Sequence, residues 1–297
     1  MIGRVDKGGQ TMLESSTADK NWTMIIRPQR HWLDLRLDKL WQARELVLLF
    51  VWRDFVSVYK QTILGPLWYL IQPLLTTITF TVIFGRIAKL PTDGLPPMLF
   101  YMAGTVIWSY FAACLTKTSN TFIANAGIFG KVYFPRLTVP LSILISNLAA
   151  FPIQLGLFLA FLAYFWLAGA AIRPTWSVLL TPVLVLMMAG LGLGFGIIVS
   201  SLTTRYRDLQ YLVTFGVQLL MYATPVVYPL STVSGTLRWL ILANPLTPIV
   251  EGFRYAFLGA GTVDGWHLLY SGAFMQVVLL IGILMFNQVE RTFMDTV

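Results

Sequence analysis

The chain has 297 residues and a formal net charge of +8, and 57% of its residues are apolar while only 11% are charged. Soluble domains carry about 25% charged residues, so the composition excludes a water-soluble globule, and an aromatic content of 14% excludes a disordered chain. One cysteine and two widely separated histidines exclude an intrachain disulfide and argue against a zinc or iron–sulfur centre. The composition predicts a protein that lies in a bilayer.

The N-terminal part of the chain divides into two predicted regions. Residues 1–35 are polar, which predicts a cytoplasmic tail without the apolar core of a signal peptide. Residues 36–61 place polar side chains at three-to-four spacing, with a gap at Leu49, between Leu, Phe and Trp, which predicts an amphipathic helix in the membrane interface. A cytosolic segment leading into the first span is the alternative. Residues 62–297 form the predicted membrane domain.

Six long segments after residue 60 contain no charged residue, and each exceeds the roughly 20 residues that a membrane-crossing helix needs. They predict an all-α polytopic membrane protein with six transmembrane helices, near residues 67–86, 97–116, 139–168, 177–202, 210–229 and 267–288. The uncharged run 137–172 is too long for one perpendicular helix. We therefore expect a break at Pro140 or Pro152, with 167–172 in the interface.

The segment 230–264, which precedes the last predicted span, is apolar in two short pieces separated by Asn244 and Pro245. Each piece is too short to cross a bilayer. Two short re-entrant helices on the outer side are predicted, with Glu251 and Arg254 paired at i,i+3. A seventh span is the alternative, and the charged residues of the segment make it unfavourable.

The distribution of lysine and arginine predicts the orientation in the membrane. Sixteen of the 21 basic residues fall in segments on the side of the N-terminus, and five fall on the other side. Because basic residues concentrate in cytoplasmic segments, both termini are predicted to be cytoplasmic and residues 230–264 to face outward. The positive charge then reports orientation, and no nucleic-acid partner is expected.

Several kinds of energy source are missing from the sequence. The cores of the predicted spans contain no acidic or basic residue, which argues against a proton-coupled transporter and a voltage sensor. The only Gly-Lys pair, Gly130-Lys131, lacks the flanking residues of a phosphate-binding loop, so no nucleotide site is predicted. Glycines 190, 192, 194 and 196 form two overlapping GxxxG spacings, which predict close helix packing. Such a chain takes its energy from a partner or is a passive pore.

Four blocks of sequence occur together in this chain. They are Arg53-Asp54 with Tyr59–Trp68 and Gln72-Pro73; Lys131–Arg136; Arg205–Leu209; and Tyr222–Pro229 followed by Asn244-Pro245 and Phe253-Arg254. As a set they resemble the permease subunits of ABC-type polysaccharide exporters, the group that handles O-antigen, capsule and teichoic acid chains. The resemblance runs from about residue 40 to the C-terminus.

The resemblance implies a homodimer of six-helix permeases in the bacterial inner membrane. Two separate cytosolic ATPase subunits would bind ATP and Mg²⁺, so the chain itself would be neither an enzyme nor a cofactor-binding protein. The implied cargo is a lipid-linked polysaccharide, usually carried on undecaprenyl pyrophosphate. An ABC exporter for a drug or a lipid is the alternative, and a membrane-embedded glycan-modifying enzyme is a weaker one, because no catalytic constellation is found.

Four groups of functional residues are predicted from the resemblance and the residue types. The ATPase-coupling group is Asn125, Gly130, Lys131, Arg136, Arg205, Arg207 and Asp208. The group for a pyrophosphate head group is Arg53, Lys60, Leu64 and Gly65, where two cations precede a helix that begins at Pro66. Ordinary topology-setting charges are the alternative for both groups.

The other two groups concern the path of the cargo. The pore-lining group is Tyr101, Trp108, Tyr110 and Tyr222, because aromatic rings pack against the faces of sugar rings. An interfacial aromatic belt is the alternative for such residues. The outer-gate group is Pro225, Tyr228, Pro229, Asn244, Pro245, Glu251 and Arg254. No catalytic residue and no metal ligand are predicted.

Overall fold

The computed structural model describes residues 37–60, 63–129, 131–132 and 134–296. The predicted tail 1–35 and the predicted coupling residue Gly130 lie outside these residues. The described part of the chain is all helical and contains no strand. Its elements are α1 (Leu37–Gln42), α2 (Arg44–Lys60), η1 (Gly65–Leu67), α3 (Trp68–Phe80), η2 (Thr81–Ile87), α4 (Pro97–Ser119), α5 (Thr121–Phe129), α6 (Thr138–Leu167), η3 (Trp176–Leu180), α7 (Thr181–Thr203), α8 (Leu209–Ala223), η4 (Leu230–Thr232), α9 (Gly235–Ala243), α10 (Thr247–Leu258) and α11 (Gly265–Thr296).

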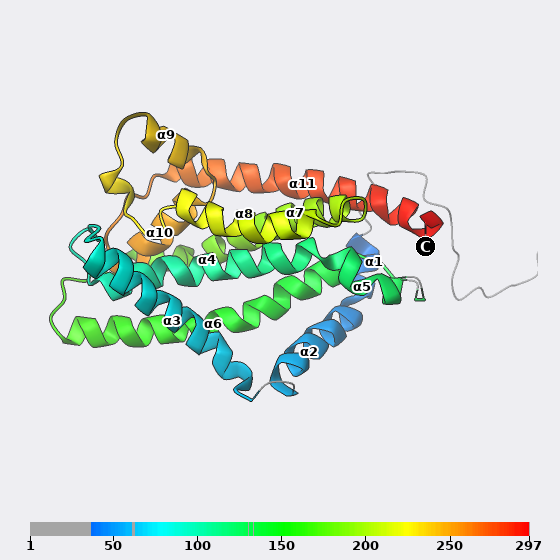
Figure 1. Cartoon of the computed structure of the whole chain (residues 1–297), viewed down its shortest axis with the longest axis horizontal. Helices are drawn as coiled ribbons and strands as arrows, with labels where there is room; N and C mark the ends of the chain where they lie inside the picture. The colour runs from blue at the N-terminus through cyan, green and yellow to red at the C-terminus, as the bar shows by residue number, and fades with distance from the viewer. Residues whose placement is uncertain (1–36, 61–62, 130, 133, 297) are drawn as a thin grey trace, which may run out of the picture. The chain divides into compact units, whose positions relative to one another are not determined.

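Two helices form the centre of the helical bundle. α4 and α7 lie side by side, α11 packs along α7, and α6 packs along α4 (Figure 1). In the most apolar part of α4, 78% of the residues are buried. The corresponding share is 67% for the span that contains α7 and 11% for the span that contains α3. α4 and α7 are therefore the core of the bundle, and the other long helices surround them.

Glycines on two faces of α7 allow this close packing. A Cβ added at Gly192 would lie 2.8 Å from Cβ of Cys114 in α4, and one at Gly194 would lie 2.8 Å from Cγ1 of Val278 in α11. The other glycine of each GxxxG spacing contacts the same neighbour one turn away, Gly196 facing α4 and Gly190 facing α11. The predicted close packing is confirmed, and the two overlapping spacings serve two different helices.

Within the described residues, five segments are long and apolar enough to cross a membrane: Gly65–Ile87, Pro97–Ser119, Thr138–Leu167, Trp176–Thr203 and Gly265–Val289. They coincide with five of the six predicted spans. The sixth, predicted near 210–229, is the shorter helix α8 of 15 residues, about 22 Å long. It ends early because Pro225 forces the preceding Thr224 into an extended conformation. The six-span count stays a prediction.

The expected break in the run 137–172 is wrong. α6 continues without interruption for 30 residues, and Pro152 lies inside it. Pro140 lies in the first turn, where a missing N–H removes no helical hydrogen bond. The helix is about 45 Å long, longer than a hydrocarbon core of about 30 Å, so α6 tilts or extends beyond that core.

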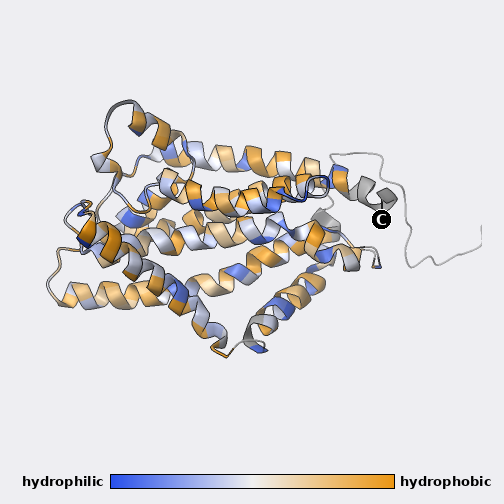
Figure 2. Cartoon of the chain, in the orientation of Figure 1, coloured by the Kyte–Doolittle hydropathy of each residue, from blue (hydrophilic) through white to orange (hydrophobic). Residues whose placement is uncertain are grey.

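The predicted amphipathic helix 36–61 consists of two helices, α1 and α2, separated at Ala43. Val47 and Phe50 of α2 are buried, and α2 packs against α6. Large apolar side chains such as Trp41 and Trp52 remain exposed on α1 and α2. Figure 2 shows apolar residues along most of α6 and α11 and more hydrophilic ones on α2. The interfacial position of α2 stays a prediction.

The two ends of the bundle differ in architecture. The two short helices that were predicted in 230–264 are present as α9 and α10, separated at Asn244 and Pro245. They lie at the end opposite α5 (Figure 1), where α10 packs beside the first turns of α4. We call these the α10 end and the α5 end. The re-entrant position of α9 and α10 in a membrane stays a prediction.

Candidate functional site

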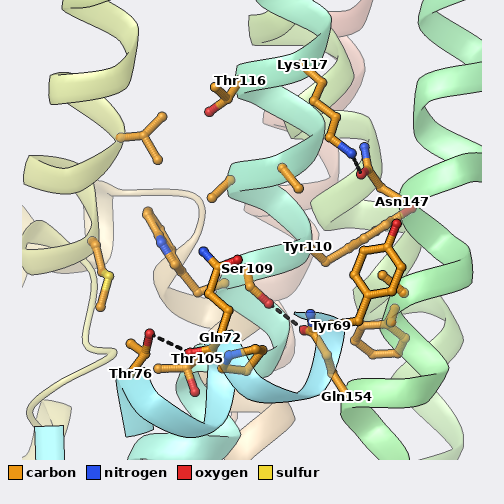
Figure 3. Close-up of a pocket in the computed structure, with 18 of the residues that line it drawn as sticks. Tyr69, Gln72, Thr76, Thr105, Ser109, Tyr110, Thr116, Lys117, Asn147 and Gln154 are labelled. Atoms are coloured by element: carbon orange, nitrogen blue, oxygen red, sulfur yellow. Dashed lines mark hydrogen bonds between the residues drawn. The ribbon is translucent and has the colours of Figure 1, made fainter. Parts of the chain in front are cut away.

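A cavity of about 540 Å³ lies between α3, α4, α6 and α8 (Figure 3). We call it the polar cavity. Its walls combine side-chain amides with aromatic rings: Gln72, Asn147, Gln154 and Gln218 with Trp68, Tyr69, Trp108, Tyr110 and Phe151. Its volume is that of a typical small-molecule site. Polar side chains in apolar helices face a protein interior or a water-filled path, so these amides mark a functional surface.

Hydrogen bonds hold several polar side chains of the wall in place. Ser109 Oγ of α4 lies 2.7 Å from Gln154 Oε1 of α6 and donates to it. Lys117 Nζ donates to Asn147 Oδ1 over 2.8 Å. Figure 3 shows both bonds crossing from α4 to α6. The cavity is therefore lined by oriented donors and acceptors.

The structure separates the four predicted pore-lining residues. Trp108 and Tyr110 line the polar cavity. Tyr101 lies about two turns nearer the α10 end, where it is buried among aromatic rings including Phe80 and Phe84. Tyr222 is 52% exposed and lines a second hollow of about 510 Å³ next to α9. One site therefore contains two of the four.

A buried ion pair organises the α10 end. Arg254 Nη1 donates to Glu251 Oε1 over 2.6 Å, and Arg254 Nη2 donates to the carbonyl oxygens of Pro225 and Val226 over 2.8 and 3.2 Å. The guanidinium also lies 3.8 Å from the ring centroid of Phe100. Burial raises the pKa of Glu251 and lowers the pKa of Arg254, and the attraction between the two charges opposes both shifts.

The other predicted outer-gate residues surround this pair. Asn244 Nδ2 donates to Thr224 Oγ1 over 2.9 Å, and Asn244 Oδ1 accepts from the backbone N–H of Leu246, so the turn before α10 is tied to the end of α8. Burial raises the pKa of Tyr228, and the negative charge of Glu251 adds to the shift. Pro229 and Pro245 begin the short connections on either side of α9. The predicted group is thus one cluster in space, and its role as a gate stays a prediction.

With this geometry in place, comparison with known proteins identifies the family. The family model described as ABC-2 type transporter matches residues 45–258, which is most of the chain. The chain belongs to this family.

The chain is similar to several named proteins over nearly their whole length. An O-antigen export system permease protein RfbA of Klebsiella pneumoniae is 28% identical over 84% of this chain and 94% of its own. The protein of the same name from Myxococcus xanthus is 28% identical over 87% of this chain and 98% of its own. The polysialic acid transport protein KpsM of Escherichia coli is 23% identical over 82% of this chain and 93% of its own.

In this ABC-2 transporter, the predicted coupling residues lie at the α5 end but differ in exposure. Lys131 is exposed just after α5. Asn125 is buried and its Nδ2 donates to the Thr121 carbonyl oxygen over 2.9 Å within the helix. Arg136 is 3% exposed and its guanidinium lies 5.5 Å from the ring centroid of Phe129. Lys131 is thus placed to meet a partner, whereas Asn125 and Arg136 belong to the interior of the permease.

The remaining coupling residues lie in the exposed turn between α7 and α8: Arg205, Arg207 and Asp208. Two hydrogen bonds attach the α5 region to α7. Thr203 Oγ1 donates to the Ser119 carbonyl oxygen and the backbone N–H of Phe122 donates to Ser200 Oγ, both over 3.3 Å. α5 is therefore a fixed part of the bundle and not a free loop.

The predicted head-group residues lie on α2 and at the start of the first span. Arg53 Nε and Nη2 both donate to Asp54 Oδ1, over 3.0 and 2.8 Å, so much of its charge is balanced within α2. Lys60 is the last residue of α2. Leu64 and Gly65 begin the short helix η1, and Gly65 has a φ of +48°, in the left-handed region that favours glycine.

Sequence reasoning missed the amides of the polar cavity and Lys117. Gln72, Asn147 and Gln154 carry no charge, so the pattern of ionisable residues does not reveal them. The span predicted near 97–116 ends just before Lys117, although Lys117 lies in the last turn of α4. Amides repeated within otherwise apolar runs were the available signal.

Proposed function

We propose that this ABC-2 transporter is the permease subunit of an ATP-driven exporter that moves a lipid-linked polysaccharide across the bacterial inner membrane. The observation that carries the proposal is similarity over nearly the whole length of permeases that are named for O-antigen export. The similarity to a polysialic acid transport protein adds a second polysaccharide. Both names concern the transport of a glycan, and membership of the ABC-2 transporter family concerns the transport machinery.

The chemistry of the polar cavity supports a glycan as cargo. Amides both donate and accept hydrogen bonds, as sugar hydroxyls require, and the rings of Trp68, Tyr69 and Trp108 offer faces against which sugar rings pack. A drug or a lipid would favour a wall of aliphatic side chains. Gln72, Gln154 and their neighbours would leave such a cargo facing unpaired polar groups.

We further propose that two copies of the chain form the transport path. On α8, Thr214 and Gln218 are exposed, and the neighbouring Tyr211 is 73% exposed. Lipid tails offer no hydrogen-bond partner for an amide or a hydroxyl group. A second copy facing this side of α8 would enclose these groups in a water-filled path between the two permeases.

The energy for transport is proposed to come from two cytosolic ATPase subunits, which bind ATP and Mg²⁺. The α5 end offers them a surface of exposed residues on α5 and just after it, Ile123, Ala124, Gly127 and Lys131. The exposed turn 205–208 lies at the same end. The distribution of lysine and arginine supports a cytoplasmic position for this end and for both termini.

The proposal is tested in a bacterium that makes the polysaccharide and depends on this chain. Deleting the gene is expected to remove the glycan from the cell surface and to leave lipid-linked glycan inside, and restoring the chain is expected to reverse both effects. The readouts are surface labelling of the glycan and analysis of lipid-linked glycan in spheroplasts. Normal surface glycan in the deletion strain would contradict the proposal.

A further inference from the structure

We propose that the polar cavity binds an anionic group of the cargo, a phosphate or a carboxylate, on the ammonium of Lys117. This inference rests on the proposed function, because it assumes that the cavity takes part of a glycan chain or of its lipid linkage. Its basis is the placement of Lys117, the charges around it and the chemistry of the cavity wall.

The ammonium of Lys117 is held in the cavity wall by an oriented amide. Asn147 is buried, and its Nδ2 donates to the Ile143 carbonyl oxygen over 2.9 Å, which leaves its Oδ1 to accept from Lys117 Nζ over 2.8 Å. A lysine ammonium has three N–H donors, so two remain for a ligand. The Lys117 side chain is exposed and lines the cavity (Figure 3).

The charges near Lys117 leave a positive balance. Lys117 forms no ion pair with any described residue, and the residues that line the cavity include no carboxylate. Asp54 of α2 is the carboxylate whose charge reaches Lys117. Nε and Nη2 of Arg53 both donate to Asp54 Oδ1, over 3.0 and 2.8 Å. Arg53, Asp54 and Lys117 together therefore carry one positive charge.

A lysine at the end of a helix also has an ordinary explanation, since positive charge is favourable at a helix C-terminus and on the cytoplasmic side. A lysine with that role alone extends its ammonium into water. Lys117 Nζ instead binds Asn147 of the neighbouring α6, inside a cavity wall. This placement is that of a group that binds a ligand.

The wall beside Lys117 fits a sugar that carries the anion. Ser109 Oγ donates to Gln154 Oε1 over 2.7 Å, so the amide nitrogen of Gln154 is left as a donor. The rings of Trp108 and Tyr110 lie in the same wall. Hydroxyl groups and ring faces would engage this part of the cavity, while a phosphate or carboxylate would sit on the ammonium.

The test measures binding of small probes to the full chain in nanodiscs of neutral phosphatidylcholine. Lactose is the neutral probe, sialyllactose adds a carboxylate to the same disaccharide, and inorganic pyrophosphate represents the lipid linkage. Lys117→Met should weaken binding of an anionic probe about ten- to hundredfold, the usual worth of a hydrogen bond to a charged group, and should leave lactose binding within about twofold. Lys117→Arg should retain anion binding, and Asp54→Asn should strengthen it.

Lys89→Met is the matched control, because Lys89 is an exposed lysine at the α10 end, in the loop before α4. It should bind all three probes as the wild type does. If Lys117→Met loses binding of sialyllactose alone, the site is assigned to an acidic sugar. If Lys117→Met loses binding of pyrophosphate alone, the site is assigned to the lipid linkage.

The inference is overturned if the wild type binds neither anionic probe, or if Lys117→Met binds both anionic probes as tightly as the wild type. It is also overturned if Lys117→Met weakens lactose binding as much as it weakens binding of the anionic probes. Failure of the proposed function has a different signature, namely a deletion strain with normal surface glycan. A wild-type affinity in Lys117→Met, together with chain-dependent export, would reject this inference alone.

Discussion

At the scale of single residues, the feature with the largest expected energetic effect is the ion pair at the α10 end. Arg254 is fully buried and contacts Glu251, two carbonyl oxygens that follow α8, and the ring of Phe100. Gly104 makes room for this arrangement, because a Cβ there would lie 2.9 Å from the Val226 carbonyl oxygen. One side chain therefore joins α4, α10 and the segment after α8.

Removing the carboxylate should destabilise the protein strongly. Glu251→Ala leaves the buried guanidinium without its counter-charge, and such a change costs about 3–5 kcal/mol. We expect a clear fall in the melting temperature of the purified permease in detergent. Asp264→Asn is the control, because Asp264 forms an exposed pair with His267 and exposed pairs contribute about 0–1 kcal/mol. Equal melting temperatures for the two variants would contradict the assignment.

The sequence predicted this pair but not the polar cavity, and the physical reasons differ. Glu251 and Arg254 lie three residues apart, so helix geometry alone brings them together. Lys117 and Asn147 lie on different helices, and so do Ser109 and Gln154. Their approach depends on how α4 and α6 pack, which local periodicity does not specify.

At the scale of elements, α7 packs closely against its neighbours on two faces. Its apolar sequence predicted a span, and its glycine spacings predicted close contact, but the partners depend on the tertiary structure. Gly192 faces α4, and Gly194 faces α11. The helix is therefore in close contact on two faces, while α8 has a face that meets no described residue closely at Gly216.

A methyl group on α7 should separate it from its neighbour. In Gly192→Ala the new Cβ would lie 2.8 Å from Cβ of Cys114 and 3.1 Å from the Phe111 carbonyl oxygen, so α4 has to shift. Overpacking of this kind costs about 1–3 kcal/mol, which thermal unfolding in detergent would measure. Gly216→Ala meets no atom within 4 Å and should leave stability unchanged or raise it. The reverse order of the two variants would refute the packing assignment.

The surface at the α5 end yields a separate test of ATPase coupling. Ile123 and Lys131 are exposed, so Ile123→Asp with Lys131→Glu should weaken co-purification of the ATPase and reduce export while the melting temperature of the permease stays the same. Arg136→Glu is unsuitable, because it would bury a reversed charge beside Phe129 and destabilise the permease itself. Unchanged ATPase binding in the double variant would show that this surface is not the contact.

At the scale of the whole molecule, the sequence predicted the succession of helices well because uncharged runs and charged boundaries report membrane segments directly. It erred at prolines in both directions, because a break was expected at Pro152 and the sixth span was expected to continue past Pro225. Pro152 is accommodated within α6, whereas Pro225 ends α8 early. A proline in the sequence does not by itself distinguish these two outcomes.

The orientation of the bundle can be tested with single cysteines in a Cys114→Ser background. Cys114 is fully buried, so its replacement removes the one native thiol without altering the surface. Ser231→Cys at the α10 end should react with an impermeant maleimide in intact cells, and Lys131→Cys at the α5 end should react only after permeabilisation. The opposite pattern would invert the proposed topology.

The glycine contacts of α7 also divide the molecule into parts with different freedom to move. Helices whose backbones touch at several successive turns cannot slide or rotate against one another without a clash. We therefore expect α4, α7 and α11 to keep their positions relative to one another. α3 and α8 border the polar cavity, and a Cβ at Gly216 of α8 would meet no atom within 4 Å, so widening of a path for a polymer is expected to displace α8 and, with it, α3. α5 is attached to α7 by the hydrogen bond from the Phe122 N–H to Ser200 Oγ, so force from an ATPase would reach α4, α7 and α11 first. The cavity would then open by motion of its other walls relative to these three helices.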